Sequence, residues 1–207
     1  MDGKTGGEQA REKSTATGGL SGFLRLVAAP AVWLFRYVRA NPLTSVLFAL
    51  LLGFVLYQRL PLYLEGRRML GQPAPELKLR DLAGREVDLK QYRGRKVLLN
   101  FWATWCGPCR VEIPALNSIH KEMAGDKFEL LAVTAEPAGY VRDFNKKKPM
   151  RYPVLIDDTG SVVNRYKIKV YPTFMFVNEQ GRITDVSHGL DLLLKWKIRR
   201  RVTGSLF

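Results

Sequence analysis

One stretch constrains the fold more than any other: an apolar run at residues 97–102 is followed at once by Cys106 and Cys109, and then by a helical pattern. The run is suited to a central strand buried on both faces. Where a strand hands over to a helix, the first sulfur meets unpaired backbone N–H groups and the helix dipole, which favour the thiolate. A second thiol one turn away can attack a mixed disulfide, so the pattern predicts redox chemistry.

Composition limits what the rest of the chain can be. The two cysteines are the only ones in 207 residues, so no structural disulfide framework is available and stability must come from packing. With 46% hydrophobic and 25% charged residues, the chain can bury one ordinary core and still include a membrane or targeting segment. We expect one globular domain that needs no cofactor.

The formal charge of +14 is concentrated in two basic runs, Lys146–Lys148 and Lys195–Arg201. Such runs are usually a solvated helix face or tail, with anionic lipid headgroups as a second reading. Nucleic acid is the weakest reading, because neither run is interleaved with stacking aromatic residues and no binding motif accompanies them.

The N-terminal part carries no globular pattern. Residues 1–21 lack periodic apolar residues and are expected to be a disordered arm. Residues 22–41 place Arg25, Arg36 and Arg39 opposite an apolar side, as in a helix that lies in a membrane interface. The alternative is an amphipathic helix packed on the domain.

Residues 42–64 are predicted to be a transmembrane anchor. Asn41 and Pro42 are a good cap and first residue for a helix, and residues 43–57 carry no charge. That uncharged stretch covers only roughly 22 Å of a roughly 30 Å hydrocarbon layer, so the span must extend into its flanks. A buried helix of a soluble protein is the alternative. Arginines stand on both sides of the span, so charge does not determine its orientation.

After a linker at residues 65–75, residues 76–207 are predicted to form an α/β domain. Alternating apolar runs and helical patterns indicate a sheet with helices on both faces, and Gln180-Gly181 indicates an antiparallel edge hairpin. The expected strands are 77–80, 86–89, 96–102, 128–134, 154–156, 173–177 and 182–186. The expected helices are 108–123, 140–147, 161–166 and 190–199.

The segment Leu99–Arg110 resembles the active-site segment of the thioredoxin superfamily. More narrowly, the chain resembles the membrane-anchored, exported TlpA/ResA-like branch in its hairpin before the central strand, in Glu112–Pro114, in the inserted strand and helix between residues 128 and 156, and in Tyr171–Thr173. The resemblance covers roughly residues 72–190. It implies a thioredoxin-like fold with a central mixed sheet, helices on both faces and an N-terminal β-hairpin.

In this pattern Cys106 is expected to be the attacking thiolate and Cys109, deeper in the helix, the resolving thiol. The alternative is a zinc half-site, because C-x-x-C is also a metal-binding spacing. That site would need His120 and His188 to converge on the helix start, and the Trp-Cys-Gly-Pro-Cys context argues against it. We therefore expect no resident metal.

Pro172 lies at the start of a predicted strand, where it cannot donate to the sheet. A trans edge-strand proline would be the default. In the resembled family this proline is cis and faces the cysteine pair, and the backbone of the preceding residue pairs with the substrate chain. We therefore expect a cis bond here and substrate contacts from Trp105, Gly107, Pro108, Tyr171 and Pro172.

Glu112 stands three residues beyond Cys109 and shares its helix face. It can accept or relay a proton, because the resolving thiol must be deprotonated to attack. The resemblance favours this role over a carboxylate that only complements the helix N-terminus. Asn100 occupies the strand position where thioredoxin itself has a buried Asp, and Asn cannot titrate, so Glu112 is the nearby candidate base.

The resemblance implies a thiol–disulfide oxidoreductase, and Gly107-Pro108 is the dipeptide of reducing members. We predict a monomeric protein-disulfide reductase, held in the cytoplasmic membrane by one span, with its domain on the extracytoplasmic, periplasmic side. The implied partners are a disulfide-containing exported protein, with oxidised apocytochrome c as one candidate, and a membrane thiol-transfer protein that reduces the pair again.

Two other functions remain open at this point. Two thiolates can bind copper(I), and a membrane-tethered module without enzymatic activity would use the basic run near the C-terminus. A redoxin-type peroxidase is less favoured, because the Thr-x-x-Cys environment of that group is absent.

Overall fold

The structure is a computed structural model that describes residues 37, 40–191 and 193–204. The chain divides into two compact units, Met1–Leu60 and Pro61–Phe207, which are described separately below. The predictions for residues 1–21, and those for all of residues 22–41 except 37, 40 and 41, fall outside the described residues.

Helix α2 (Pro42–Met69) begins at the proline predicted as its first residue. In the described part of the chain, it is the one helix long and apolar enough to cross a membrane, with a mean hydropathy of 1.7 and none of that stretch buried. The helix continues past Leu64 into residues predicted as linker. Contacts within the second unit account for this extension: Glu65 pairs with Lys169 at 2.9 Å, and Met69 packs against a buried cluster.

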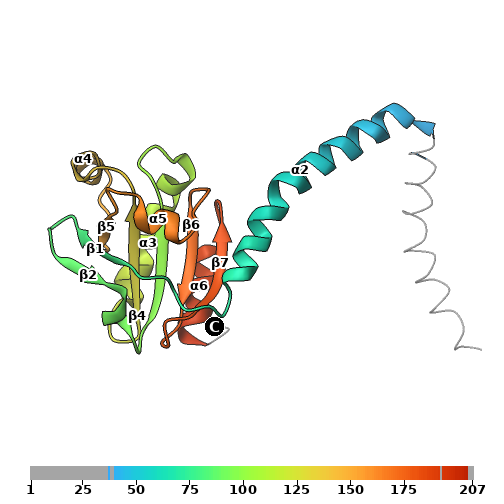
Figure 1. Ribbon diagram of the computed structural model, residues 1–207. Helices are drawn as coiled ribbons and strands as arrows, with labels where there is room; N and C mark the ends of the chain where they lie inside the picture. Colours follow the sequence, from blue (N-terminus) through green and yellow to red (C-terminus); the bar gives the residue numbers. More distant parts are fainter. Residues whose placement is uncertain (1–36, 38–39, 192, 205–207) are drawn as a thin grey trace, which may run out of the picture. The chain divides into compact units, whose positions relative to one another are not determined.

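The second unit is built on a mixed seven-stranded sheet of order β2-β1-β5-β4-β3-β6-β7 (Figure 1). Its strands are β1 (Lys78–Asp81), β2 (Glu86–Asp88), β3 (Lys96–Phe101), β4 (Phe128–Thr134), β5 (Val154–Ile156), β6 (Thr173–Val177) and β7 (Ile183–His188). β3, β4 and β5 are parallel neighbours, whereas the pairs β1–β2, β1–β5, β3–β6 and β6–β7 are antiparallel. The predicted antiparallel edge hairpin is β6–β7.

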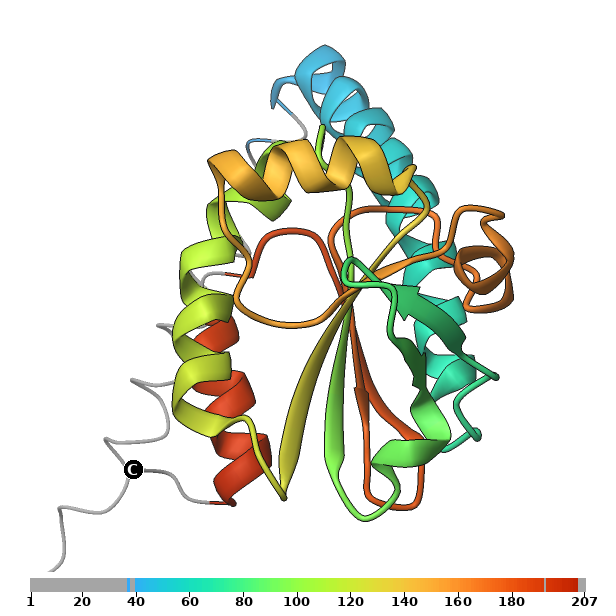
Figure 2. The ribbon, with the colours of Figure 1, turned by 90° about the vertical axis from the view of Figure 1, so that its left-hand side faces the viewer.

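Helices cover both faces of this sheet, as predicted. On one face α3 (Gly107–Met123) and α6 (Leu194–Thr203) lie side by side, and α5 (Ser161–Arg165) and the 3₁₀ helix η1 (Leu89–Tyr92) cover the other (Figure 2). The remaining helix, α4 (Ala138–Lys147), packs on the α3 side through Val141. Because β3 is central, its alternate residues enter different cores: Leu98 faces α3 and Leu99 faces α5.

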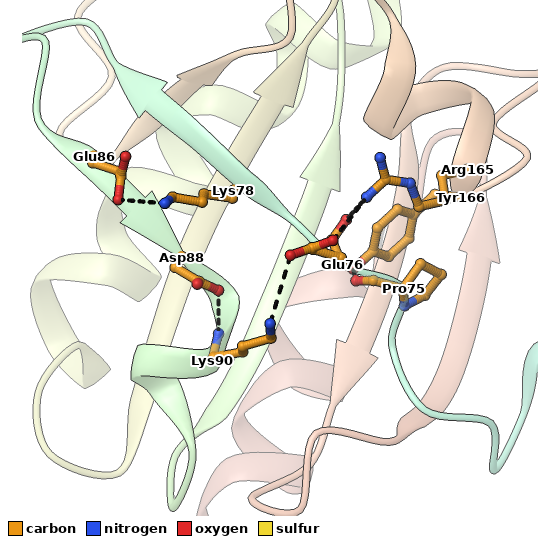
Figure 3. Close-up of polar contacts among 8 residues, drawn as sticks. All are labelled: Pro75, Glu76, Lys78, Glu86, Asp88, Lys90, Arg165 and Tyr166. Atoms are coloured by element: carbon orange, nitrogen blue, oxygen red, sulfur yellow. Dashed lines mark hydrogen bonds and ion pairs between the residues drawn. The ribbon is translucent and has the colours of Figure 1, made fainter.

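Polar contacts secure the segment that enters the sheet (Figure 3). The Tyr166 hydroxyl donates to the Pro75 carbonyl at 2.7 Å, and Arg165 donates to the Glu76 carbonyl at 2.7 Å. Lys90, just after β2, pairs with the Glu76 carboxylate at 3.5 Å. The hairpin is thereby attached to α5 on the sheet face opposite α3.

One boundary differs from the prediction in a way that matters for the site. The last helix was expected at residues 190–199, but α6 begins at Leu194 and ends at Thr203, before Gly204 in the left-handed region. The residues before it make other contacts: the Asp191 carboxylate accepts from the Leu193 N–H at 3.0 Å, and its own N–H donates to Glu112 at 3.0 Å. A helix through residue 191 would use that N–H differently.

Candidate active site

The two cysteines lie where β3 gives way to α3. Cys106 occupies the N-cap position and α3 starts at the next residue, so the strand-to-helix prediction is correct. The two sulfurs are joined in a disulfide, and the Cys109 N–H points at the Cys106 sulfur at 3.2 Å. Both cysteines are buried, at 4% and 3% exposure. In the reduced protein the same N–H and the helix dipole would stabilise a Cys106 thiolate.

A tight turn delivers Cys106 to the helix, and a carboxylate holds it. The Cys106 N–H donates to the Ala103 carbonyl at 3.2 Å, which closes the turn around Thr104 and Trp105. The Thr104 N–H and hydroxyl donate to the two carboxylate oxygens of Glu136 at 2.5 and 2.6 Å. This acid, which follows β4, therefore fixes the backbone two residues before the first sulfur.

The rim of the site is aromatic on one side and open above the helix start. The Trp105 ring, 70% exposed, meets the Tyr171 ring edge-on with centroids 5.7 Å apart. The Tyr171–Pro172 bond is cis, as predicted. A Cβ built on Gly107 would meet no described atom within 4 Å. These residues, together with Pro108 in the first turn of α3, are the ones expected to contact substrate.

Glu112 is the buried acid of the site, at 4% exposure. Its Oε1 accepts from the Asp191 N–H at 3.0 Å, while Oε2 is buried and accepts from none of the described residues. Burial raises the pKa of Glu112 to about 7, and the Asp191 N–H opposes part of that rise. The carboxyl therefore exchanges its proton near neutral pH, which is what a proton carrier for thiol chemistry requires.

Asn100 and Tyr152 lie on the same face of the sheet. Asn100 is paired in register with Ala132 of β4 and Phe174 of β6, and it is 4% exposed. Tyr152 is buried in the core beneath α3, and both burial and the negative charge of Glu112 raise the pKa of its hydroxyl. Glu112 is thus the carboxyl that the fold places in the core under this helix, where Asn100 cannot titrate.

Sequence reasoning missed three residues that contact the site. Glu136 was findable, because it and Thr104 follow the parallel neighbours β3 and β4, whose carboxyl ends meet at one sheet edge. His188 was findable from the β6–β7 hairpin, whose register pairs it with Thr173, the residue after Pro172. No local signal points to Asp191, because its contact with Glu112 spans 79 residues.

The histidines and the basic run have other partners. His120 lies 3.3 Å from Glu129 in β4 and packs against the Tyr152 ring, whereas His188 contacts Thr173. Within the described residues, no three His, Cys, Asp or Glu side chains form a group that could hold a metal ion. Four basic residues of the C-terminal run form ion pairs with acids of the domain: Lys195 and Arg199 with Glu122, Lys197 with Asp191, and Arg201 with Asp185.

Comparisons with known proteins agree with this geometry. The AhpC/TSA family model matches residues 70–186. The thioredoxin-like protein YneN of Bacillus subtilis is 42% identical over 123 residues, which are 58% of this chain and 71% of that protein. The thiol-disulfide oxidoreductase ResA of Bacillus thuringiensis is 33% identical over 132 residues, covering 63% of this chain and 76% of that protein. The crystal structure of the exposed lipoprotein thioredoxin Etrx1 of Streptococcus pneumoniae superposes with a TM-score of 0.57 at 27% identity, covering 63% of this chain and 99% of that one.

Proposed function

The chain belongs to the AhpC/TSA family and is a ResA-like thiol–disulfide oxidoreductase with a Cys106–Cys109 pair, and we propose that it works as a reductant of disulfides in exported proteins. The observation that carries the proposal is the combination of Cys106 at the start of α3 with a buried acid, Glu112, one turn beyond Cys109. The first favours a nucleophilic thiolate, and the second provides a base for the resolving thiol.

The proposed reaction starts from the reduced pair. The Cys106 thiolate attacks one sulfur of the substrate disulfide, a mixed disulfide forms, and the other substrate sulfur leaves as a thiolate that takes up a proton. The ionised Glu112 accepts the proton of Cys109, whose thiolate then attacks the Cys106 sulfur. The substrate leaves as a dithiol with two electrons from the protein, and the protein ends with the Cys106–Cys109 disulfide.

Substrate binding is assigned to the rim. An extended substrate segment would pair with the backbone at Tyr171, beside Pro172, with its disulfide above the helix start at Gly107 and Pro108. Trp105 offers the exposed apolar surface against which such a segment can pack. This assignment follows the resemblance and is supported by the open space above Gly107.

The reducing direction is supported by Gly107-Pro108 and is tested by a potential. Full-length protein in detergent is equilibrated with dithiothreitol or glutathione buffers, and its dithiol and disulfide forms are counted by thiol alkylation. Potentials in the superfamily run from about −270 mV to about −120 mV, and a reductant falls toward the first value. A potential near that of a strong oxidant would refute the reducing direction.

A cysteine variant tests the activity itself. Cys106→Ser is expected to abolish the reduction of insulin disulfides, whereas Cys109→Ser is expected to accumulate the mixed disulfide. Retained reductase activity in Cys106→Ser would contradict the proposal.

The proposed location follows from α2. One N-terminal apolar helix precedes the domain, and we assign it as an uncleaved anchor that holds the domain outside the cytoplasm. In that compartment the pair must be reduced again by a membrane thiol-transfer partner, and oxidised apocytochrome c is a candidate substrate. A thiol reagent that cannot cross membranes should label Cys106 in intact, pre-reduced cells, on a chain of full length. A shortened chain would identify α2 as a cleaved signal.

A further inference from the structure

The short segment that leaves β7, His188–Asp191, contacts two separate parts of the site. The Gly189 N–H donates to the Pro172 carbonyl at 2.8 Å. Two residues later, the Asp191 N–H donates to Glu112 Oε1 at 3.0 Å. Four consecutive residues thus join the strand start assigned to substrate binding and the carboxyl assigned to proton transfer.

The first residue of this segment adds a side-chain contact. The His188 ring nitrogen Nδ1 lies 3.0 Å from the Thr173 hydroxyl oxygen, which in turn lies 2.8 Å from the Val170 carbonyl. A carbonyl can only accept, so the single hydroxyl hydrogen of Thr173 goes to Val170. Nδ1 of His188 must then carry the proton and donate to Thr173. This chain of two hydrogen bonds ties β7 to both ends of the Val170–Thr173 stretch.

The position of the His188 ring is constrained on its other side. Gly66, in the last turn but one of α2, is buried, and a Cβ built there would lie 3.6 Å from His188 Nε2 and 3.6 Å from Val186. The ring therefore lies between the end of α2 and the residue after Pro172. Gly189, at φ +79°, then turns the chain toward Glu112, in a backbone conformation that other residues rarely adopt.

We propose that His188 is a positioning residue that keeps the Val170–Pro172 stretch and Glu112 in a fixed mutual arrangement through the segment His188–Asp191. The inference rests on the proposed function, since it concerns the same substrate strand and the same proton carrier. His188 touches neither the sulfurs nor, in this assignment, the substrate. It acts through Thr173 on one side and through the backbone of its own segment on the other.

Loss of the His188 contact has two expected consequences. Thr173 is released, so the backbone that pairs with substrate is less well ordered and the KM for a protein disulfide rises. The segment also holds Asp191 less firmly, and because the Asp191 N–H lowers the pKa of Glu112, that pKa rises. The other ionisable groups that act on Glu112 are the Asp191 carboxylate, itself paired with Lys197 at 2.5 Å, and the buried Tyr152.

The test compares His188→Leu with His188→Asn in the full-length protein in detergent. Asn places its Nδ2–H near the position of Nδ1–H, whereas Leu has no donor. For insulin reduction, Leu should raise KM about fivefold, as expected for the loss of one ordinary hydrogen bond, while Asn stays near the parent. The pH midpoint of kcat should also move upward in Leu and not in Asn, which a purely structural role would not produce.

A folded His188→Leu variant with the parental KM and the parental pH midpoint would overturn the proposal. If that variant does not fold, Thr173→Val and Thr173→Ser repeat the comparison from the other partner, because Ser keeps the hydroxyl and Val removes it. Equal KM values for those two would also overturn it.

Failure of the proposed function has a different signature. A pH profile that Glu112→Gln leaves unchanged would remove the proton-carrying role of Glu112 in a protein whose His188 is intact. The two proposals are therefore refuted by different variants.

Discussion

Two buried carboxyl groups of this domain have opposite acidities. Glu112 in α3 is 4% exposed and Asp81 at the end of β1 is 7% exposed, yet the pKa of Glu112 is raised to about 7 and that of Asp81 is lowered. Burial acts in the same direction on both. The difference is in the donors around each carboxyl.

Asp81 is surrounded by donors. It accepts from the Ala83 and Arg85 N–H groups, each at 2.9 Å, and from the Arg85 guanidinium at 2.8 Å. Burial alone would raise the pKa of Asp81, but these donors outweigh it. Glu112 accepts one printed hydrogen bond, from a backbone N–H. The comparison teaches that a structural carboxylate and a proton-exchanging one differ in hydrogen bonding more than in depth.

The largest expected effect is on the pH dependence of stability. The pKa of Glu112 rises on folding, so its stabilising contribution is complete below its unfolded pKa of about 4.5 and is lost as pH rises through about 7. Between pH 4 and pH 8 the oxidised parent should lose about 3 kcal/mol relative to Glu112→Gln. Urea denaturation of both proteins at each pH measures this difference. A constant difference across the range would mean that Glu112 titrates normally.

The next effect is on activity. Glu112→Gln removes the base that accepts the Cys109 proton and should lower the insulin-reduction rate at pH 8 about a hundredfold. In the parent, the rate should rise with pH through about 7 as the carboxylate forms. Asp81→Asn is the matched control and should keep the parental rate. Comparable losses in both variants would erase the functional distinction between the two carboxyls.

The third effect is the stability contributed by Asp81. Asp81→Asn should lower the free energy of unfolding at pH 7 by about 2 kcal/mol, because hydrogen bonds to a buried charge are lost. Because folding lowers the pKa of Asp81, this contribution is present above its unfolded pKa and disappears as pH falls below about 4. Denaturation at pH 7 and pH 3 checks the sign, and an effect that grows toward pH 3 would contradict it.

The smallest effect separates the donors of Asp81. Arg85→Met removes the guanidinium, which is 76% exposed, and leaves both backbone donors in place. The expected loss is about 0.5 kcal/mol, as for other exposed ion pairs. A loss equal to that of Asp81→Asn would show that the ion pair, rather than the turn backbone, holds the carboxylate.

Much of the fold was predictable because its signals are local. The apolar run of β3, the cysteines at the start of α3 and the turn before β7 each reflect a short-range rule of backbone or capping chemistry. Boundaries moved where distant contacts compete with local preference. α2 continues to Met69 because Glu65 and Met69 find partners in the domain, and α6 starts late because Asp191 binds Glu112.

The sequence by itself determined the dithiol, its place at a helix N-terminus and the acid one turn beyond it, because all three depend on spacing along one helix. Tertiary structure alone decided what surrounds them. The Glu136–Thr104 bonds join residues 32 apart, and the Asp191–Glu112 bond joins residues 79 apart. The acidity of Glu112 depends on that burial and on that single donor. A carboxyl's pKa is set by the groups that the fold brings against it, and no local pattern encodes them.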